Sequence, residues 1–159
     1  RALLAGRMDI ITVTDPPTNL ELKVKRIGSL ELIMVASQPN LSIEDIPSVG
    51  HVFVDWGTAF NLEQARIFNE PVAPTLHTGQ SHIALEFLLS HGGAAFLPVA
   101  LVTPYLERGL LYQLNDASSA IQEVHLVFTK HSEKALQLAP IIAMLEGLDI
   151  KPDDPLADF

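Results

Sequence analysis

Three short apolar runs of this sequence end in turns whose side chains could bind a polar molecule. The turns lie in "ITVTDPP", "DWGTAFN" and "LHTGQSHI", and each contains a threonine or a serine. A hydroxyl at such a place can accept a hydrogen bond from a ligand or from the first turn of a helix. The second and third turns also contain a glycine, which lets backbone amides approach a bound group closely. A fourth run, "AAFLPV", follows a glycine pair.

Two explanations of these turns are open. Thr58 or Asn61, and Thr78 or Ser81, could simply cap the helices that follow them. A shared cleft for a polar ligand explains the three turns equally well. In α/β proteins with parallel strands, ligands bind at the carboxyl ends of the strands, which is where these turns fall.

The turn after "HVFVD" contains the single tryptophan of the chain. Trp56 is either a core residue or one wall of a pocket, and both interpretations stay open at this point. Asp55 stands at the end of the same run and could bind a ligand amine. We expect it instead to accept hydrogen bonds from the turn amides around Gly57.

The sequence offers little that predicts catalysis. "GQSHI" resembles a nucleophile elbow, but that motif needs a glycine where Ile83 stands, so we do not expect Ser81 to be a nucleophile. The six histidines lack the HxxxH and HExxH spacings of metal sites, and the absence of cysteine excludes thiolate chemistry. "HGGA" lacks the ending of a phosphate loop and is typical of a chain reversal after a helix. We therefore expect no catalytic residue, metal site or cofactor.

Alternating strands and helices must position these turns. Runs rich in Val, Ile and Phe predict buried strands, namely "MDIITV", "LELIMVAS", "HVFVDW", "AAFLPV" and "VHLVFTK". Between and after them, helical spacing predicts helices over residues 61–69, 81–91, 99–108 and 134–148. Leu62, Ala65 and Phe68 would form the inner face of the first, and Ala84, Phe87 and Leu88 that of the second. This alternation predicts an α/β fold with a largely parallel sheet.

Composition limits the possible partners. The 159 residues include 10 basic and 19 acidic side chains, a net charge of −9, so this chain should repel a phosphate backbone and not bind DNA by itself. Its apolar runs are shorter than the ~18 residues of a membrane span, and its start lacks the order of a signal peptide. The first residues resemble the end of a helix, so we interpret the chain as a fragment of a longer protein.

Several segments follow one another in the order and spacing of a known family. "LLAGRMDIITVTDPP", "IGSLELIMVAS" and "LSIEDIPSVGHVFVDW" come first. "TGQSHIALEFLLSHGGAAFLPVALV", "GLLYQL" and "VHLVFTKHSEKALQLAPIIAML" follow. Over about residues 1–148, this order resembles the effector-binding domain of LysR-type transcriptional regulators.

The resemblance implies a fold like that of type 2 periplasmic-binding proteins. Two Rossmann-like lobes are joined by two crossing strands in that fold, and an effector cleft lies between the lobes. Residues 1–30 and 125–150 would form the first lobe, residues 31–124 the second lobe, and residues 151–159 a C-terminal tail. The family's preceding strand, helix and second strand would be missing, so the first lobe would be incomplete in this chain.

Cleft residues of the family come from strand ends and helix N-termini. Matched position by position, the resemblance implies ligand contacts from Thr14, Trp56, Gly57, Thr58, Thr78, Gly79, Gln80, Ser81, Phe96 and Pro98. The "WGT" step is not a general feature of the family. We therefore expect residues 56–58 to distinguish the ligand of this protein.

The resemblance also implies a function. The chain would be the effector-sensing and oligomerisation domain of a bacterial, cytoplasmic transcription regulator that binds a small polar or anionic metabolite between its lobes. It would form homodimers or homotetramers and reach DNA only through a winged helix-turn-helix absent from this chain, without a membrane contact. The alternative is a periplasmic-type solute-binding protein for transport. A hydrolase that uses Ser81 and His82 ranks below both.

Overall fold

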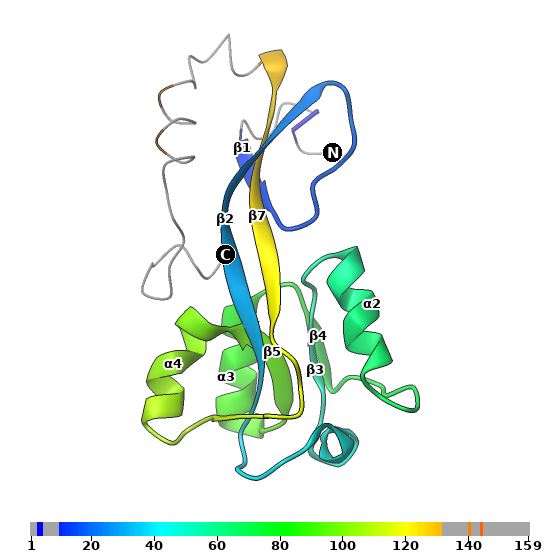
Figure 1. Ribbon diagram of the computed structural model, residues 1–159, viewed down its shortest axis with the longest axis vertical. Helices are drawn as coiled ribbons and strands as arrows, with labels where there is room; N and C mark the ends of the chain where they lie inside the picture. Colours follow the sequence, from blue (N-terminus) through cyan, green and yellow to red (C-terminus); the bar gives the residue numbers. More distant parts are fainter. Residues whose placement is uncertain (1–2, 5–9, 132–139, 141–143, 145–159) are drawn as a thin grey trace. The chain divides into compact units, whose positions relative to one another are not determined.

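The computed structural model describes residues 3–4, 10–131, 140 and 144, which form two compact units (Figure 1). The described residues of the first unit belong to Arg1–Ser29 and Gln122–Ile150, and those of the second to Leu30–Ile121. Both units contain strands, and the described helices of the second unit alternate with its strands, so the predicted α/β class is confirmed.

Three strands form the described part of the first unit. Strand β1 (Ile10–Val13) pairs antiparallel with β7 (Ala120–Thr129), with Ile10 opposite Phe128 and Val13 opposite His125. Strand β2 (Leu22–Ala36) lies on the other side of β7 in the sheet order. The 15 residues of β2 continue past Ser29 into the second unit.

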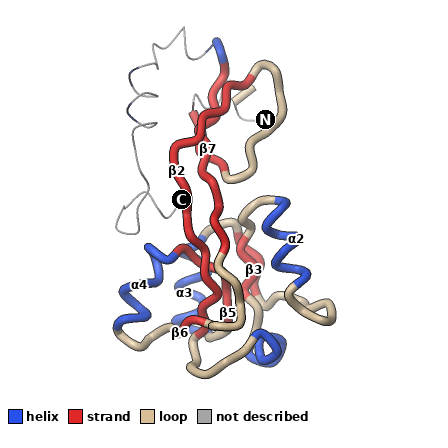
Figure 2. The backbone as a smooth tube through the Cα atoms, in the orientation of Figure 1, coloured by secondary structure: helices blue, strands red, loops and turns tan. Residues whose placement is uncertain are grey.

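The second unit is built around five strands. The last residues of β2 pair antiparallel with β5 (Ala94–Pro98) and with the short β6 (Tyr112–Gln113). Strand β3 (Val52–Val54) pairs parallel with β4 (Leu76–Thr78), and a parallel bridge from His51 to Ala94 places β3 beside β5 (Figure 2). Because β3, β4 and β5 run in the same direction, their carboxyl ends share one edge.

Short helices connect these strands. The turn η1 (Ile43–Asp45) and α1 (Ile46–Val49) precede β3, and α2 (Thr58–Arg66) follows it. Helix α3 (Ser81–His91) packs against β3, β4 and β5 through buried Ala84, Leu85 and Leu88, and α4 (Val99–Glu107) follows β5. Among the described residues, none of the helices has both the length and the apolar character needed to cross a bilayer.

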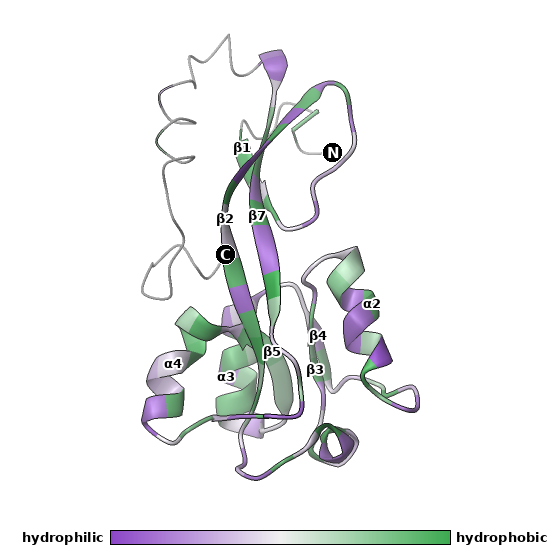
Figure 3. Ribbon diagram, in the orientation of Figure 1, coloured by the Kyte–Doolittle hydropathy of each residue, from purple (hydrophilic) through white to green (hydrophobic). Residues whose placement is uncertain are grey.

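The predicted helix over residues 81–91 is confirmed, and the one over 99–108 ends one residue early, at Glu107. The predicted helix over residues 61–69 is wrong in its bounds and in its inner face. Helix α2 begins at Thr58, and its buried residues are Phe60 and Gln64, whereas Leu62 is 54% exposed. Figure 3 shows α2 as mostly hydrophilic and α3 as mostly hydrophobic, so α2 gives a much weaker apolar pattern. The predicted helix over 134–148 lies outside the described residues.

The predicted strand positions are confirmed, but the expectation of a largely parallel sheet is wrong. Strand β2 pairs antiparallel with β5 and β6, and β1 pairs antiparallel with β7. Apolar runs in a sequence do not reveal the direction in which strands pair, and β2 also begins at Leu22, well before the predicted run at Leu30. Its first half, "LKVKRIGS", is too polar to stand out as a buried strand.

His51 is the buried histidine among the six, all of which the structure describes. Its side chain is only 3% exposed, and the rings of Phe53 and Phe68 lie edge-on against it, with centroids 5.9 and 5.0 Å away. Burial lowers the pKa of His51 from 6.5 to about 4. The imidazole is therefore neutral in the folded protein at neutral pH.

The folded protein is expected to lose stability as the pH falls from 6.5 to 4. In this window the unfolded chain binds a proton on His51 that the folded chain does not bind, which costs about 2 kcal/mol at pH 5 relative to pH 7. Urea unfolding at both pH values measures this loss. The variant His51→Phe, which keeps a ring among Phe53 and Phe68, should lose most of this pH dependence. An unchanged difference between pH 7 and pH 5 would show that His51 is not its source.

Candidate functional site

The candidate site lies at the shared carboxyl edge of β3, β4 and β5 in the second unit. Helix α2 begins just after β3, α3 just after β4, and α4 directly after β5. The structure brings most of the predicted site residues to this edge: Trp56, Gly57, Thr58, Thr78, Gly79, Gln80, Ser81, Phe96 and Pro98. Thr14 follows β1 in the first unit, and its participation stays a prediction.

Trp56 is a core residue that fixes the end of β3. Its side chain is 4% exposed, and its indole Nε1–H donates a 3.0 Å hydrogen bond to the backbone oxygen of Phe96. Phe96 is also 4% exposed and packs edge-on against Phe60 of α2, with ring centroids 5.1 Å apart. Of the two interpretations of Trp56, the structure supports the core residue. Trp56 thus ties the turn between β3 and α2 to β5.

Asp55 holds the same turn in place. One of its carboxylate oxygens accepts hydrogen bonds from the N–H of Gly57, at 3.0 Å, and from the side-chain amide of Asn61, at 2.6 Å. The amide of Asn61, and after it the N–H of Gly57, lower the pKa of the Asp55 carboxyl below its usual value. The expectation that Asp55 bonds the amides around Gly57 is confirmed. Gly57 has a φ of 100°, a conformation that favours glycine.

The end of β4 is bonded to the end of β3. The backbone oxygen of Thr78 accepts a 2.9 Å hydrogen bond from the N–H of Asp55. The hydroxyl of Thr78 accepts a 3.1 Å hydrogen bond from the N–H of Gln80, which is the N-cap residue of α3. Gly79 and Gln80 are exposed, whereas Ser81 is only 6% exposed. The two turns therefore form one connected rim.

The first turns of α2 and α3 give this rim its chemistry. The N-cap residues are Gly57, which has no side chain, and Gln80, whose side chain makes no capping hydrogen bond. Thr58 and Ser81 are the first residues of the two helices rather than their N-caps. The hydroxyl of Thr78 accepts from the N–H of Gln80 and the side-chain oxygen of Asn61 from the N–H of Trp56, so these two side chains bond the turns that precede the helices. The first N–H groups of a helix have no partner inside the helix and carry a partial positive charge. Two such helix starts on neighbouring strands can bind an anionic or strongly polar group.

Sequence reasoning missed the part that Asn61 plays. Its side-chain oxygen accepts hydrogen bonds from the N–H of Trp56, at 3.1 Å, and from the amide of buried Gln64, at 3.3 Å. Its amide nitrogen donates to Asp55. The sequence offers Asn61 only as a candidate helix cap. These contacts depend on α2 beginning at Thr58, three residues before the predicted start.

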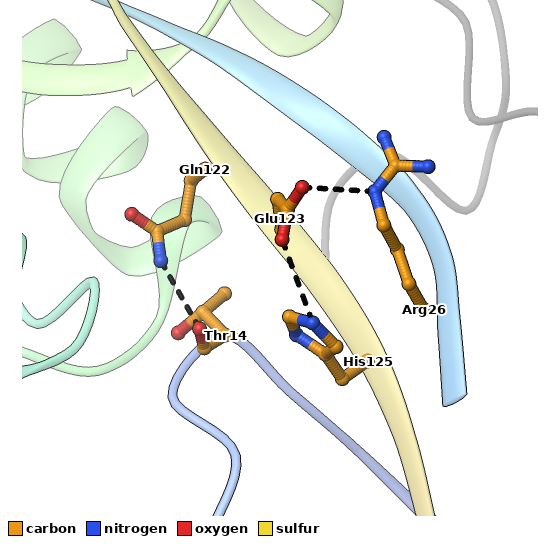
Figure 4. A network of polar contacts seen from close by, with 5 residues as sticks. All are labelled: Thr14, Arg26, Gln122, Glu123 and His125. Atoms are coloured by element: carbon orange, nitrogen blue, oxygen red, sulfur yellow. Dashed lines mark hydrogen bonds and ion pairs between the residues drawn. The ribbon is translucent and has the colours of Figure 1, made fainter. Parts of the chain in front are cut away.

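Thr14 lies beside a polar network in the first unit (Figure 4). Its backbone oxygen accepts a 3.1 Å hydrogen bond from the side-chain amide of Gln122 on β7. On the same strand, Glu123 pairs with Nε of Arg26 at 3.1 Å and with Nε2 of His125 at 3.6 Å. The bond from Gln122 holds the end of β1 against β7 and so helps to fix the position of Thr14 within the first unit, whereas the Arg26–Glu123 pair joins β2 to β7.

The chain resembles known proteins over most of its length. The family model described as the LysR substrate binding domain matches residues 1–148. The regulator HdfR of Yersinia enterocolitica, named as a helix-turn-helix-type transcriptional regulator, is 23% identical over 137 residues, which cover 80% of this chain and 46% of that protein. HdfR of Yersinia pestis (strain Pestoides F) is 30% identical over 101 residues, covering 58% of this chain and 34% of that protein. This chain thus spans less than half the length of these relatives.

Solved structures show the same fold. The regulatory domain of CrgA, a LysR-type transcriptional regulator from Neisseria meningitidis, superposes with a TM-score of 0.69 at 17% identity, covering 91% of this chain and 77% of that one. The regulatory domain of HypT from Salmonella typhimurium, in its apo form, gives a TM-score of 0.72 at 16% identity, covering 91% and 76%. The fold is the two-lobe α/β fold of periplasmic-binding-protein type, as the sequence resemblance implied.

Proposed function

Since this chain belongs to the family of LysR substrate-binding domains, we propose that it is the effector-sensing part of a bacterial transcription regulator. The relatives are named as transcriptional regulators rather than enzymes, which supports a binding role. The same two-lobe fold could also serve a solute-binding protein for transport, but the names of the relatives favour regulation. The proposal places the protein in the cytoplasm, where a regulator meets DNA.

The effector in this proposal is a small polar or anionic metabolite held at the carboxyl edge of β3, β4 and β5. The observation that carries the proposal is that α2 and α3 both begin at this edge, at Gly57, which has no side chain, and at Gln80, whose side chain makes no capping hydrogen bond. Their first-turn amides would bind the charged group, with Thr58, Thr78 and Gln80 at the rim. Trp56, Phe96 and Pro98 are buried, so they would shape the site from beneath.

Thr14 would supply a contact from the first unit, as the family resemblance implies. An effector that touches both units would bind the closed arrangement of the lobes more tightly than the open one, and would thereby shift their equilibrium. In a homodimer or homotetramer that shift would alter how the attached DNA-binding domains grip their sites. DNA contact in this proposal belongs to a part of the protein outside this chain, in keeping with the net charge of −9.

Anion binding at the start of α3 is tested by Gly79→Asp. Among the described residues, no atom lies within 4 Å of the position that a Cβ would take at Gly79, so a side chain fits there without strain. An aspartate near a helix N-terminus does not destabilise the helix, but it repels an anion bound there. The intact regulator is screened by thermal shift against sulfate, phosphate and small dicarboxylates. We expect one of them to raise Tm, because a ligand of the native state alone adds about 2.7 kcal/mol at 100 times its Kd.

The control for this experiment is Gly79→Ala, which adds a methyl group but no charge. Gly79→Asp should remove the shift in Tm, and Gly79→Ala should retain it. The proposal fails if none of the anions shifts Tm, or if Gly79→Asp responds to the active anion as strongly as the native protein.

A further inference from the structure

Two buried side chains of the second unit leave one polar atom each without a partner among the described residues. His51 is 3% exposed and Gln64 is fully buried, and the unpaired atoms are Nε2 of His51 and Oε1 of Gln64. A buried polar atom without a hydrogen bond costs free energy, so native proteins rarely leave one without a reason. The reason can be a bound molecule that completes the hydrogen bonds.

The orientation of the Gln64 side chain is fixed by its other contacts. Its amide nitrogen donates to the backbone oxygen of Val54, at 2.8 Å, and to the side-chain oxygen of Asn61, at 3.3 Å. Exchanging the nitrogen and oxygen of this amide would set oxygen against oxygen at the Val54 contact. The unpaired atom of Gln64 is therefore an acceptor, and it needs an O–H or N–H donor.

Both side chains line a hollow of about 520 Å³, which we call the α2 pocket. His51, directly before β3, and Phe53, within it, lie two residues apart in extended chain, so their side chains point to the same face of the sheet, where α2 contributes Gln64 and Ala65. The segment from Phe68 to Pro74, between α2 and β4, supplies most of the remaining wall. This volume is in the usual range for a small-molecule site.

The walls of the α2 pocket indicate the kind of molecule that fits. Phe53, Phe68, Pro71, Val72 and Pro74 are apolar. The charged or titratable side chains at its lining besides His51 are Glu70 and His77, both exposed. Burial keeps His51 neutral at neutral pH by lowering its pKa to about 4, so the buried end of the pocket offers no charge to pair with an ion.

We propose that the α2 pocket is a second ligand site, for a small, uncharged, largely apolar molecule that carries one hydroxyl or N–H group. A hydroxyl donates its hydrogen to Oε1 of Gln64 and accepts a hydrogen bond from Nε2–H of His51, and an N–H group donates to Oε1 of Gln64 alone, while the apolar body packs against Phe53 and Phe68. The pocket shares no described lining residue with the strand-end site, so the two sites are distinct.

Phenol is the probe for this site, and toluene is its matched analogue without a donor. Binding to the intact protein is followed by saturation-transfer difference NMR across a concentration series. We expect phenol to bind saturably and toluene to bind at least about tenfold more weakly, because toluene leaves Gln64 unpaired. Equal affinities, or the absence of saturable phenol binding, would overturn the proposal.

A substitution that fills the pocket locates the binding. Ala65 lines the hollow and is solvent-exposed, so Ala65→Phe places a ring in the pocket without disturbing the core. Ala59 is another exposed alanine of α2 that does not line the hollow, and Ala59→Phe is the control. We expect Ala65→Phe to weaken phenol binding at least about tenfold and Ala59→Phe to leave it unchanged. Unchanged binding in Ala65→Phe, with Tm preserved, would place the phenol elsewhere and refute the assignment.

Discussion

Replacing Trp56 by alanine is expected to lower the free energy of unfolding by roughly 3–5 kcal/mol. The indole is 4% exposed, and its removal leaves a large cavity beneath the turn that joins β3 to α2. It also leaves the backbone oxygen of Phe96 without the 3.0 Å hydrogen bond that it accepts from Nε1. Urea unfolding followed by circular dichroism measures the loss. A loss below about 1 kcal/mol would mean that Trp56 is not part of the core, since buried aromatic truncations cost several times as much.

The variant Trp56→Phe separates the packing of the indole from its hydrogen bond. Phenylalanine keeps much of the apolar volume but has no N–H, so this variant should lose about 1–3 kcal/mol through the unpaired oxygen of Phe96. Both variants should also weaken effector binding. Trp56 fixes the turn from which the first amides of α2 point, and a loosened turn no longer holds them in one orientation.

The helix over residues 81–91 could be predicted because its hydrophobic spacing decides its buried face. Ala84 and Leu88 of the predicted inner face recur at helical intervals, and both are buried against the sheet. Phe87, the third residue of that predicted face, is only half-buried, and Leu85 is buried instead. Helix α2 could not be predicted in the same way. Its buried residues include Gln64, whose amide nitrogen donates to the backbone oxygen of Val54, and hydrophobicity gives no sign of such a partner. The exposed Leu62 then misled the assignment of the inner face.

The position of the candidate site could be predicted, but the contacts that support it could not. The hydroxyl and glycine residues fall at strand ends in the sequence, and parallel strands bring their ends to one edge. The bonds from Asn61 to Trp56, Asp55 and Gln64 join residues of a turn and a helix that meet only after α2 has formed. They also connect the strand-end site to the α2 pocket, because Gln64 lines that pocket. Hydrophobic spacing along the sequence does not predict side-chain hydrogen bonds between a turn and a helix.

The glycine pair in "HGGA" makes the chain reversal that its place after a helix predicted. Gly92 is the C-cap of α3, and its N–H donates to the backbone oxygen of Leu88. Gly93 follows with a φ of 114° and accepts the N–H of Ser37 on its backbone oxygen, at 3.0 Å. These two residues turn the chain from α3 directly into β5. The reversal therefore sets the start of the strand on which Phe96 lies.

Gly93→Ala is expected to destabilise the protein by roughly 3 kcal/mol, because it adds backbone strain to a steric clash. A φ of 114° is costly for any residue with a Cβ, and a Cβ at Gly93 would lie 2.8 Å from the backbone oxygen of Gly50. That oxygen accepts the 2.9 Å hydrogen bond from Ala94 that joins β3 to β5, so relief of the clash must separate these strands. Urea unfolding tests the prediction. Gly79→Ala is the matched control and should change stability by less than about 0.5 kcal/mol.

The same substitution should also impair effector binding, although Gly93 lies at the opposite end of β5 from Pro98. A shift of β5 against β3 displaces the oxygen of Phe96 from the indole of Trp56, since that hydrogen bond joins these two strands near the site. The first amides of α2 then lose their fixed orientation. If Gly93→Ala is as stable as Gly79→Ala, the close approach of Gly93 to Gly50 does not constrain the sheet. In that case the geometry of the strand ends must be set by the Trp56 and Asp55 contacts alone.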